Sequence, residues 1–225
     1  MSDWNFLAFV VFPYVSLTIF VVGHAYRYYT DPYRWNAKSS ELLDRESLKY
    51  SSVIFHYGMV FTFIGHAGGM VIPQRIYDAL GVNGQVHTRL AILAGAVFGA
   101  MAVIGALLLL RRRVSSRRVS RNSTKNDLFT LCLILFVAIV GTYNVFFGHY
   151  YVLDTIAPWI RSIVTFTPDY TLMINVPIMY KVHILAAFAI FAWSPFSRLI
   201  HIWSLPLTYL LRNHIVFRKR SIELP

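Results

Sequence analysis

The chain has 225 residues, of which 56% are hydrophobic, and it carries a formal charge of +11 with a mean hydropathy of +0.53. A soluble domain is typically about 45–50% apolar, and here the excess is gathered into blocks of the length, roughly 20 residues, that crosses a bilayer as a helix. This pattern predicts a membrane protein and argues against a nucleic-acid-binding domain, because the basic runs stand between the apolar blocks.

Five apolar blocks predict an all-α integral membrane bundle of five transmembrane helices. They cover approximately 5–26, 53–72, 90–110, 128–147 and 182–203, and we expect them to form a single membrane domain over 1–225. The first block lacks the basic start and the small-residue cleavage pattern of a signal peptide, so it reads as a retained helix. Pro195 interrupts the last block.

The basic residues predict the orientation of the bundle. With five spans and the N-terminus outside, the loops 28–52 and 111–125 and the C-terminal tail face the cytoplasm. All of the 21 Lys and Arg residues but four then lie on that side, which is a strong positive-inside signal. The four exceptions are Arg75, Arg89, Arg161 and Lys181.

Two segments between the blocks have helical patterns of their own. The polar stretch AKSSELLDRESLKY predicts a short cytoplasmic surface helix, and together with LTYLLRNHIVFRKR in the tail it is a candidate docking surface for a partner. The stretch PWIRSIVTF predicts an interfacial helix in the outer loop. The single cysteine, Cys132, excludes a disulfide within the chain, and no CxxCH motif offers covalent haem attachment.

Four of the eight histidines lie in the second and fifth apolar blocks, while the others lie at span ends or in loops. An ionisable residue inside a membrane is costly and by default indicates a functional site. His56 and His66 lie in the second block, and His183 and His201 lie near the two ends of the fifth. Because these two blocks run in opposite directions, His56 and His201 share the cytoplasmic level, while His66 and His183 share the outer level.

Each depth-matched pair could clamp one flat metal macrocycle, since neutral imidazole is a common axial ligand of haem iron. The pairs therefore predict two non-covalent b-type haems. Ten residues of helix rise about 15 Å and eighteen rise about 27 Å, so helix tilt or a kink at Pro195 must absorb the difference. The alternative for each histidine is a hydrogen-bonded packing residue.

Residues around the histidines fit the same interpretation. Gly58, Gly65, Gly68 and Gly69 remove side-chain bulk, as a flat ring pressed against the backbone requires, although small residues also serve helix packing. Arg198, one turn before the last of the four histidines, is a candidate partner for a haem propionate. Its alternative role is anchoring by positive charge at the membrane surface.

Three stretches of the chain resemble the gamma subunit of respiratory nitrate reductase, and the similarity covers nearly the whole sequence. They are GHAYRYYTDPYRWNAKSSELLDRESLKY, FHYGMVFTFIGHAGGM and FSRLIHIWSLP. The resemblance implies a five-helix cytochrome b of the prokaryotic cell membrane. It anchors an iron–sulfur beta subunit and a molybdenum-containing alpha subunit on the cytoplasmic side. By position, it assigns the inner haem to His56 and His201 and the outer haem to His66 and His183.

The resemblance further implies that quinol is oxidised near the outer face and that its electrons pass inward to the iron–sulfur subunit. The family has a basic residue in the loop before the third span, where this chain reads QVHTRLA, so His87 or Arg89 would take that place. A histidine there could bind the quinol and accept its proton, the alternative being a solvated interfacial histidine. Gly65 beside His66 would leave room for the quinol ring.

Two other functions stay open from the sequence. Related dihaem subunits that feed sulfur-linked reductases share this architecture, and the terminal electron acceptor belongs to the partner. A haem-free transporter or passive anchor is a different class. Transporters often show inverted repeats and paired broken helices, whereas no repeat is visible here and only the last block is broken.

Overall fold

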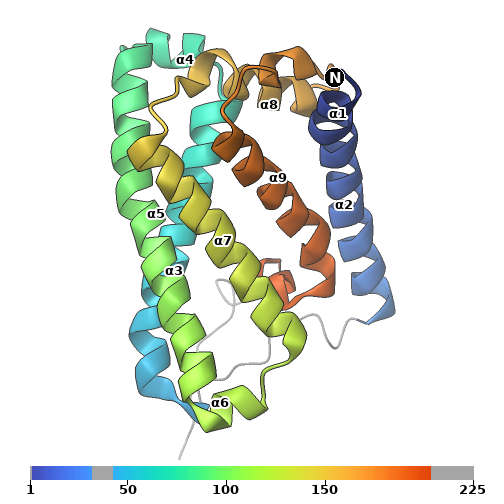
Figure 1. Ribbon diagram of the computed structural model, residues 1–225, viewed down its shortest axis with the longest axis vertical. Coiled ribbons are helices and arrows are strands. Elements are labelled where there is room, and N and C mark those ends of the chain that lie inside the picture. The colour runs from blue at the N-terminus through green and yellow to red at the C-terminus, as the bar shows by residue number, and fades with distance from the viewer. Residues whose placement is uncertain (1, 32–42, 204–225) are drawn as a thin grey trace, which may run out of the picture.

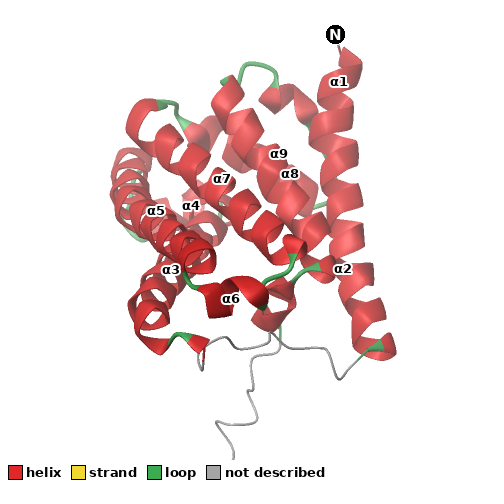
Figure 2. Cartoon of the chain, turned by 60° about the horizontal axis from the view of Figure 1, so that its bottom comes forward, coloured by secondary structure: helices red, strands yellow, loops and turns green. Residues whose placement is uncertain are grey.

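The computed structural model describes residues 2–31 and 43–203, and within these ranges its regular elements are all helical (Figures 1 and 2). The α-helices are α1 (Ser2–Phe6), α2 (Phe12–Thr30), α3 (Arg45–His66), α4 (Gln74–Ala79), α5 (Gly84–Ser115), α6 (Arg117–Arg121), α7 (Lys125–Phe147), α8 (Ile156–Val164) and α9 (Ile178–Trp193). Short π and 3-10 helices connect or extend them, and these are η1 (Leu7–Val11), η4 (Ala67–Val71), η5 (Val152–Asp154), η6 (Tyr170–Met173), η7 (Ser194–Phe196) and η8 (Arg198–Ile202). The expected all-α architecture is confirmed for the described residues.

Four helices in the described ranges are long and apolar enough to cross a membrane. They are Trp4–Thr30, Gly84–Ser115, Lys125–Phe147 and Ile178–Phe196, and they match four of the five predicted spans. The remaining one, 53–72, falls on α3 and η4. α3 is less apolar than the four, because its first turns read RESLKY and two histidines follow.

The long helices are packed side by side in an arc. α3 packs along α5, α5 along α7, α7 along α9 and α9 along α2 (Figure 1). The closest approach is between α3 and α5, where a Cβ on Gly58 would collide with the backbone of Ala102 and one on Gly105 would lie 2.5 Å from the backbone of Phe55. The expectation that Gly58 makes room beside the histidines is therefore wrong, because this glycine lets two helices touch.

A hydrophobic core at one end of the bundle joins η1, α8 and α9. Trp159 of α8 is fully buried in it, and its indole N–H donates to the Phe9 carbonyl oxygen at 3.0 Å. Pro13 has no N–H for that carbonyl four residues before it, so the indole satisfies an oxygen that the proline leaves without its α-helical donor. The stretch PWIRSIVTF thus forms a helix, as predicted, and this helix closes the end of the bundle.

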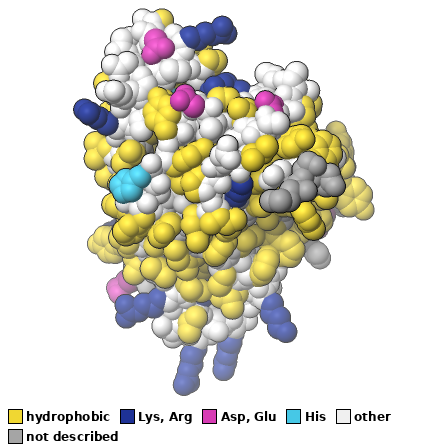
Figure 3. All heavy atoms as spheres, turned by 45° about the horizontal axis from the view of Figure 1, so that its top comes forward, with side chains coloured by type: hydrophobic (Ala, Val, Ile, Leu, Met, Phe, Trp, Pro, Cys, Tyr) yellow, Lys and Arg dark blue, Asp and Glu magenta, His cyan; other side chains and the backbone are white. Residues whose placement is uncertain are grey.

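The basic runs lie at the opposite end, around the end of α5, α6 and the start of α7. Figure 3 shows hydrophobic side chains in a band across the middle of one face, with Lys and Arg side chains beyond it. Arg112 is buried here and donates to the Asp44 carbonyl oxygen at 2.9 Å and to Ser47 Oγ at 3.1 Å. The stretch RESLKY is thereby fixed as the first turns of α3 and is not the separate surface helix that was expected, while residues 32–42 lie outside the described ranges.

Candidate functional site

Two histidine pairs link α3 to the last helical segments. The ring centroids of His56 and His201 lie 6.1 Å apart, and those of His66 and His183 lie 6.0 Å apart. α3 supplies one ring of each pair, α9 supplies His183 and η8 supplies His201. The structure therefore brings together the residues that the sequence pairs by depth, although α3 and α9 are not among the closely packed helices of the described chain.

A break in the last helix reconciles the unequal spacing of the histidines. α9 ends at Trp193, a 3-10 turn with Pro195 follows, and Ser197 is extended with φ −119° and ψ −178°. The chain then turns into η8, which carries His201. The interruption at Pro195, one of the two explanations left open by the sequence, is present in the structure.

All four rings are oriented by backbone carbonyl groups. Their Nδ1 atoms lie 2.7 Å from Ser52 O for His56, 2.7 Å from Thr62 O for His66, 3.0 Å from Val137 O for His183 and 2.6 Å from Arg198 O for His201. A carbonyl oxygen only accepts hydrogen bonds, so each Nδ1 is the protonated nitrogen and the lone pair lies on Nε2. This is the tautomer in which a histidine binds metal through Nε2 while a carbonyl fixes its ring.

The spacing and surroundings of the pairs fit axial ligation of haem iron. Metal–nitrogen bonds of about 2 Å on both sides of one metal ion place two imidazole centroids about 6 Å apart, close to both observed distances. His56 and His66 are exposed although each faces a partner ring, and a Cβ on Gly65 would meet no atom within 4 Å. Among the described residues, no three His, Cys, Asp or Glu side chains converge on a metal site, so these histidines stand as pairs.

Gly141 of α7 is a site residue that sequence reasoning missed. A Cβ at this position would lie 2.6 Å from Cε1 of His183, so only a glycine lets α7 pass this ring. Its signal is a glycine within an otherwise bulky apolar block, FVAIVGTYNVFF. Such a glycine is also common in plain helix packing, and the ring it accommodates comes from another helix.

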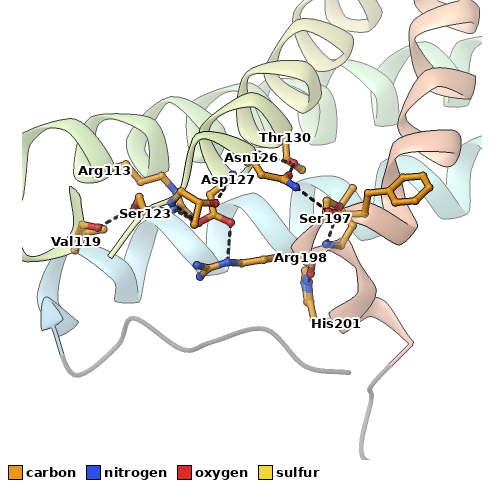
Figure 4. A network of polar contacts seen from close by, with 12 residues as sticks. Arg113, Val119, Ser123, Asn126, Asp127, Thr130, Ser197, Arg198 and His201 are labelled. Atoms are coloured by element: carbon orange, nitrogen blue, oxygen red, sulfur yellow. Dashed lines mark hydrogen bonds and ion pairs between the residues drawn. The ribbon is translucent and has the colours of Figure 1, made fainter. Parts of the chain in front are cut away.

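Arg198 lies beside the inner pair and is bound to a carboxylate of α7. Its Nε lies 2.6 Å from Oδ1 of Asp127, and its carbonyl oxygen accepts the Nδ1–H of His201 (Figure 4). The expected contact of Arg198 with a haem propionate remains a prediction. Asp127 was not singled out in the sequence, where it reads as an ordinary residue in the first turn of a helix.

His87 is buried at the start of α5, beside α4. Its Nδ1 lies 2.7 Å from Oε1 of Gln74, whose Nε2 donates to Asp78 Oδ1 at 2.9 Å and to the Val82 carbonyl at 3.0 Å. Because both of these partners only accept, the direction of the amide is fixed and its oxygen faces His87. The His87 Nδ1 is therefore the donor, and Nε2 carries the lone pair.

The lone pair of His87 faces the backbone that follows the outer pair. A Cβ on Gly69, in η4 one turn after His66, would lie 3.4 Å from Nε2 of His87, and the Tyr77 ring lies 4.4 Å from the His87 ring. Arg89 is exposed on the same helix. His87 thus lies at the same end of the bundle as the outer pair, while a role for either residue in quinol binding remains a prediction.

Comparison with known protein families identifies the family of this chain. The model of the nitrate reductase gamma subunit family matches residues 5–220. The chain belongs to the nitrate reductase gamma subunit family. This membership confirms the resemblance seen in the three sequence stretches.

Individual relatives are similar over nearly the whole of this chain. The nitrate reductase gamma chain of Bacillus subtilis is 41% identical over 216 residues, which cover 94% of this chain and 96% of the relative. The respiratory nitrate reductase 1 gamma chain of Escherichia coli is 33% identical over 225 residues, 98% of this chain and 100% of the relative. The nitrate reductase-like protein NarX of Mycobacterium tuberculosis is also 33% identical, over 96% of this chain but only 34% of that protein.

Membership of the gamma family sets the general role of the chain. A nitrate reductase gamma chain is a subunit of an oxidoreductase complex and acts together with other subunits. The four apolar helices agree with a membrane protein.

Proposed function

We propose that this gamma chain is the b-type dihaem subunit of a respiratory nitrate reductase, which oxidises quinol near the outer face of the membrane and delivers the electrons to a cytoplasmic iron–sulfur subunit. The strongest support is the arrangement of the four histidines in two pairs. The ring centroids lie 6.1 Å apart in one pair and 6.0 Å apart in the other, and every Nδ1 lies at a carbonyl oxygen. Haem iron held between them would supply one-electron transfer between quinol and the partner.

The proposed ligand sets follow the pairs. His56 and His201 hold the inner haem iron, and His66 and His183 hold the outer one. The carbonyl bonds fix each ring, so the Nε2 atoms are oriented before a metal binds. Arg198 has five N–H donors, and we propose that it binds a propionate of the inner haem while its Nε remains on Asp127.

The proposed quinol site lies beside the outer pair. Gly65 leaves space next to His66, and His87 presents the lone pair of Nε2, which can accept the proton of a quinol hydroxyl. Protons accepted at this end would leave to the outer side. Arg89 is the alternative polar partner for the quinol, from the exposed side of the same helix.

We propose that α3 and η4 form the remaining membrane span, the second in chain order, and that the whole chain, 1–225, is one membrane domain. α3 packs along α5, which is itself apolar enough to cross the membrane, and its middle exposes Val53, Val60, Phe61 and Phe63. Exposed apolar side chains on a helix bound to a membrane helix are best covered by lipid. The basic end with α6 would then be cytoplasmic, and the N-terminus would lie outside.

The proposed partners are the iron–sulfur beta subunit and the molybdenum-containing alpha subunit of the same complex, held on the cytoplasmic surface. The segments that we expect to bind them, around 37–49 and in the tail at 207–220, lie largely outside the described residues. The chain itself has one cysteine, Cys132, so an iron–sulfur cluster cannot be held by its own thiolates. Electrons therefore need a partner subunit to reach nitrate.

The test is a visible spectrum of the purified protein, oxidised and reduced with dithionite, with haem quantified per chain. We expect two low-spin b haems in the wild type and one in His66→Ala, because that variant loses one axial ligand. His149→Asn is the matched control: it removes an exposed histidine at φ 42°, a conformation that Asn tolerates, and should keep both haems. A wild-type protein that stays colourless after haem supplementation would instead indicate a haem-free anchor or transporter.

A further inference from the structure

The segment Ser194–Arg198, which joins α9 to η8 and which we call the joint, is held by side chains of α7. Asn126 Nδ2 donates to the Phe196 carbonyl oxygen at 2.7 Å, and the next residue, Asp127, binds Arg198 Nε at 2.6 Å (Figure 4). Two consecutive residues at the start of α7 therefore hold the backbone and the side chain of the joint. The joint is the backbone connection between α9 and η8, which carries His201.

The other side of the joint is held from α2. Arg27 Nη1 donates to the carbonyl oxygens of Pro195 at 2.6 Å and Ser197 at 3.2 Å. These carbonyls lie where the regular helix has ended and have lost the partners of an unbroken α-helix. The break at Pro195 is thus stabilised between two helices and adopts one defined conformation.

Asp127 is the central residue of this arrangement. Its side chain is only 3% exposed, and it binds Arg198 on one oxygen and receives the Thr124 backbone N–H on the other at 2.9 Å. Arg113 Nη1 lies 3.8 Å from the same carboxylate. A buried carboxylate is costly unless it is paired and hydrogen-bonded, and here two guanidinium groups and a helix N-terminus meet it.

We propose that Asp127, acting through Arg198, is a positioning residue that sets the orientation of the His201 ring towards His56. The connection is direct, because the residue whose guanidinium Asp127 binds is the residue whose carbonyl accepts the Nδ1–H of His201 at 2.6 Å. A displacement of Arg198 therefore rotates or shifts the ring. This inference rests on the proposed function, since it assigns the ring to the inner haem.

The two pairs differ in a way that makes the proposal measurable. The ring planes of His56 and His201 cross at 75°, whereas those of His66 and His183 cross at 34°. The splitting of the iron d orbitals depends on the angle between the two axial imidazole planes, so the low-temperature electron paramagnetic resonance spectrum should contain two distinct low-spin signals. The more nearly perpendicular inner pair should give the signal with the larger maximum g value.

The test compares Asp127→Asn with the wild type by this spectrum and by redox titration of both haems. An asparagine oxygen still accepts the Thr124 N–H, but it lacks the charge that binds Arg198. We expect two haems per chain, a shifted or broadened inner signal, a raised inner reduction potential and an unchanged outer signal. The outer haem is the internal control, and the maximum g value separates ring orientation from the simple loss of a negative charge.

A matched variant separates positioning from helix capping. Thr124→Ala removes the other half of the capping box at the same helix end but leaves the carboxylate on Arg198, so the inner signal should stay that of the wild type. Arg198→Gln breaks the same ion pair from its other side, although it also removes the proposed propionate contact. An inner signal that stays unchanged in this variant therefore counts against the proposal even if Asp127→Asn does not fold.

Two results would overturn the proposal. An inner signal that stays unchanged in Asp127→Asn and Arg198→Gln, with both haems bound, shows that the ion pair does not orient the ring. A shift in Thr124→Ala as large as that in Asp127→Asn assigns the effect to the helix end. A wild type without haem would instead remove the proposed function itself, so the two failures are distinguishable.

Discussion

His87 is oriented by an amide whose own direction is fixed. Both N–H groups of Gln74 donate to acceptors, on Asp78 and Val82, so the amide oxygen of Gln74 faces the His87 ring. The lone pair of Nε2 then points towards Gly69, where an added Cβ would lie only 3.4 Å from it. At the scale of single residues, this is the part of the site best arranged to accept a proton.

Replacing His87 with Gln removes the proton acceptor but keeps a polar side chain. We expect quinol oxidation to slow by about 100-fold, the order of a general-base contribution, and to lose the decline towards acid pH that protonation of Nε2 causes. Rates measured from pH 5 to pH 8 with saturating quinol check this, with Gln74→Leu as the companion variant, which should be slower yet keep the acid decline. A wild-type pH profile in His87→Gln would assign the proton to another acceptor.

The four membrane histidines could be paired from the sequence because depth along a helix follows from residue number. The tautomer of His183 could not be predicted, since the carbonyl that orients this ring belongs to Val137, on another helix. Asp127 and Gln74 were missed for a similar reason. Each looks like an ordinary residue at the start of a helix. Only its contact in the folded chain, with Arg198 for Asp127 and with His87 for Gln74, places it in the candidate site.

At the scale of helices, the contact of α3 with α5 depends on glycine. Gly58→Ala would drive a methyl group into the backbone of Ala102, so we expect a destabilisation of about 1–3 kcal/mol, as for other overpacked contacts. Thermal unfolding in detergent, followed by the helical circular dichroism signal, measures it. Gly65→Ala, on the same helix with no atom within 4 Å, should melt like the wild type. Equal melting of the two variants would show that α3 can move away from α5.

Hydropathy predicts where the long helices lie, but it does not predict the residues at which they begin and end. α5 extends from Gly84 to Ser115, beyond the predicted 90–110, because Asn83 caps it and the arginines continue it past the apolar block. The last predicted span, 182–203, becomes α9 and two 3-10 turns. Pro195 marked the interruption in the sequence, but its direction depends on the side chains of Arg27 and Asp127, which come from elsewhere in the chain.

At the scale of the whole molecule, the distribution of basic residues predicts the orientation. In a Cys132→Ser background, Thr167→Cys at the end with α8 should react with an impermeant maleimide in intact cells, while Ser120→Cys in α6 should react only after the membrane is opened. Both positions are exposed, so the difference reports the side of the membrane. The reverse pattern of labelling would invert the proposed topology and place the quinol site on the cytoplasmic side.

The separation of the two histidine pairs along α3 has an electrical consequence. His56 and His66 are ten residues apart on one continuous helix, a rise of about 15 Å, which is about half of a hydrocarbon layer of about 30 Å. Carrying one electron from the outer pair to the inner pair would then cost on the order of 1 kcal/mol for every 100 mV of membrane voltage. Each electron that crosses the bundle would thus add to the voltage across the cell membrane, and turnover would slow as that voltage rises.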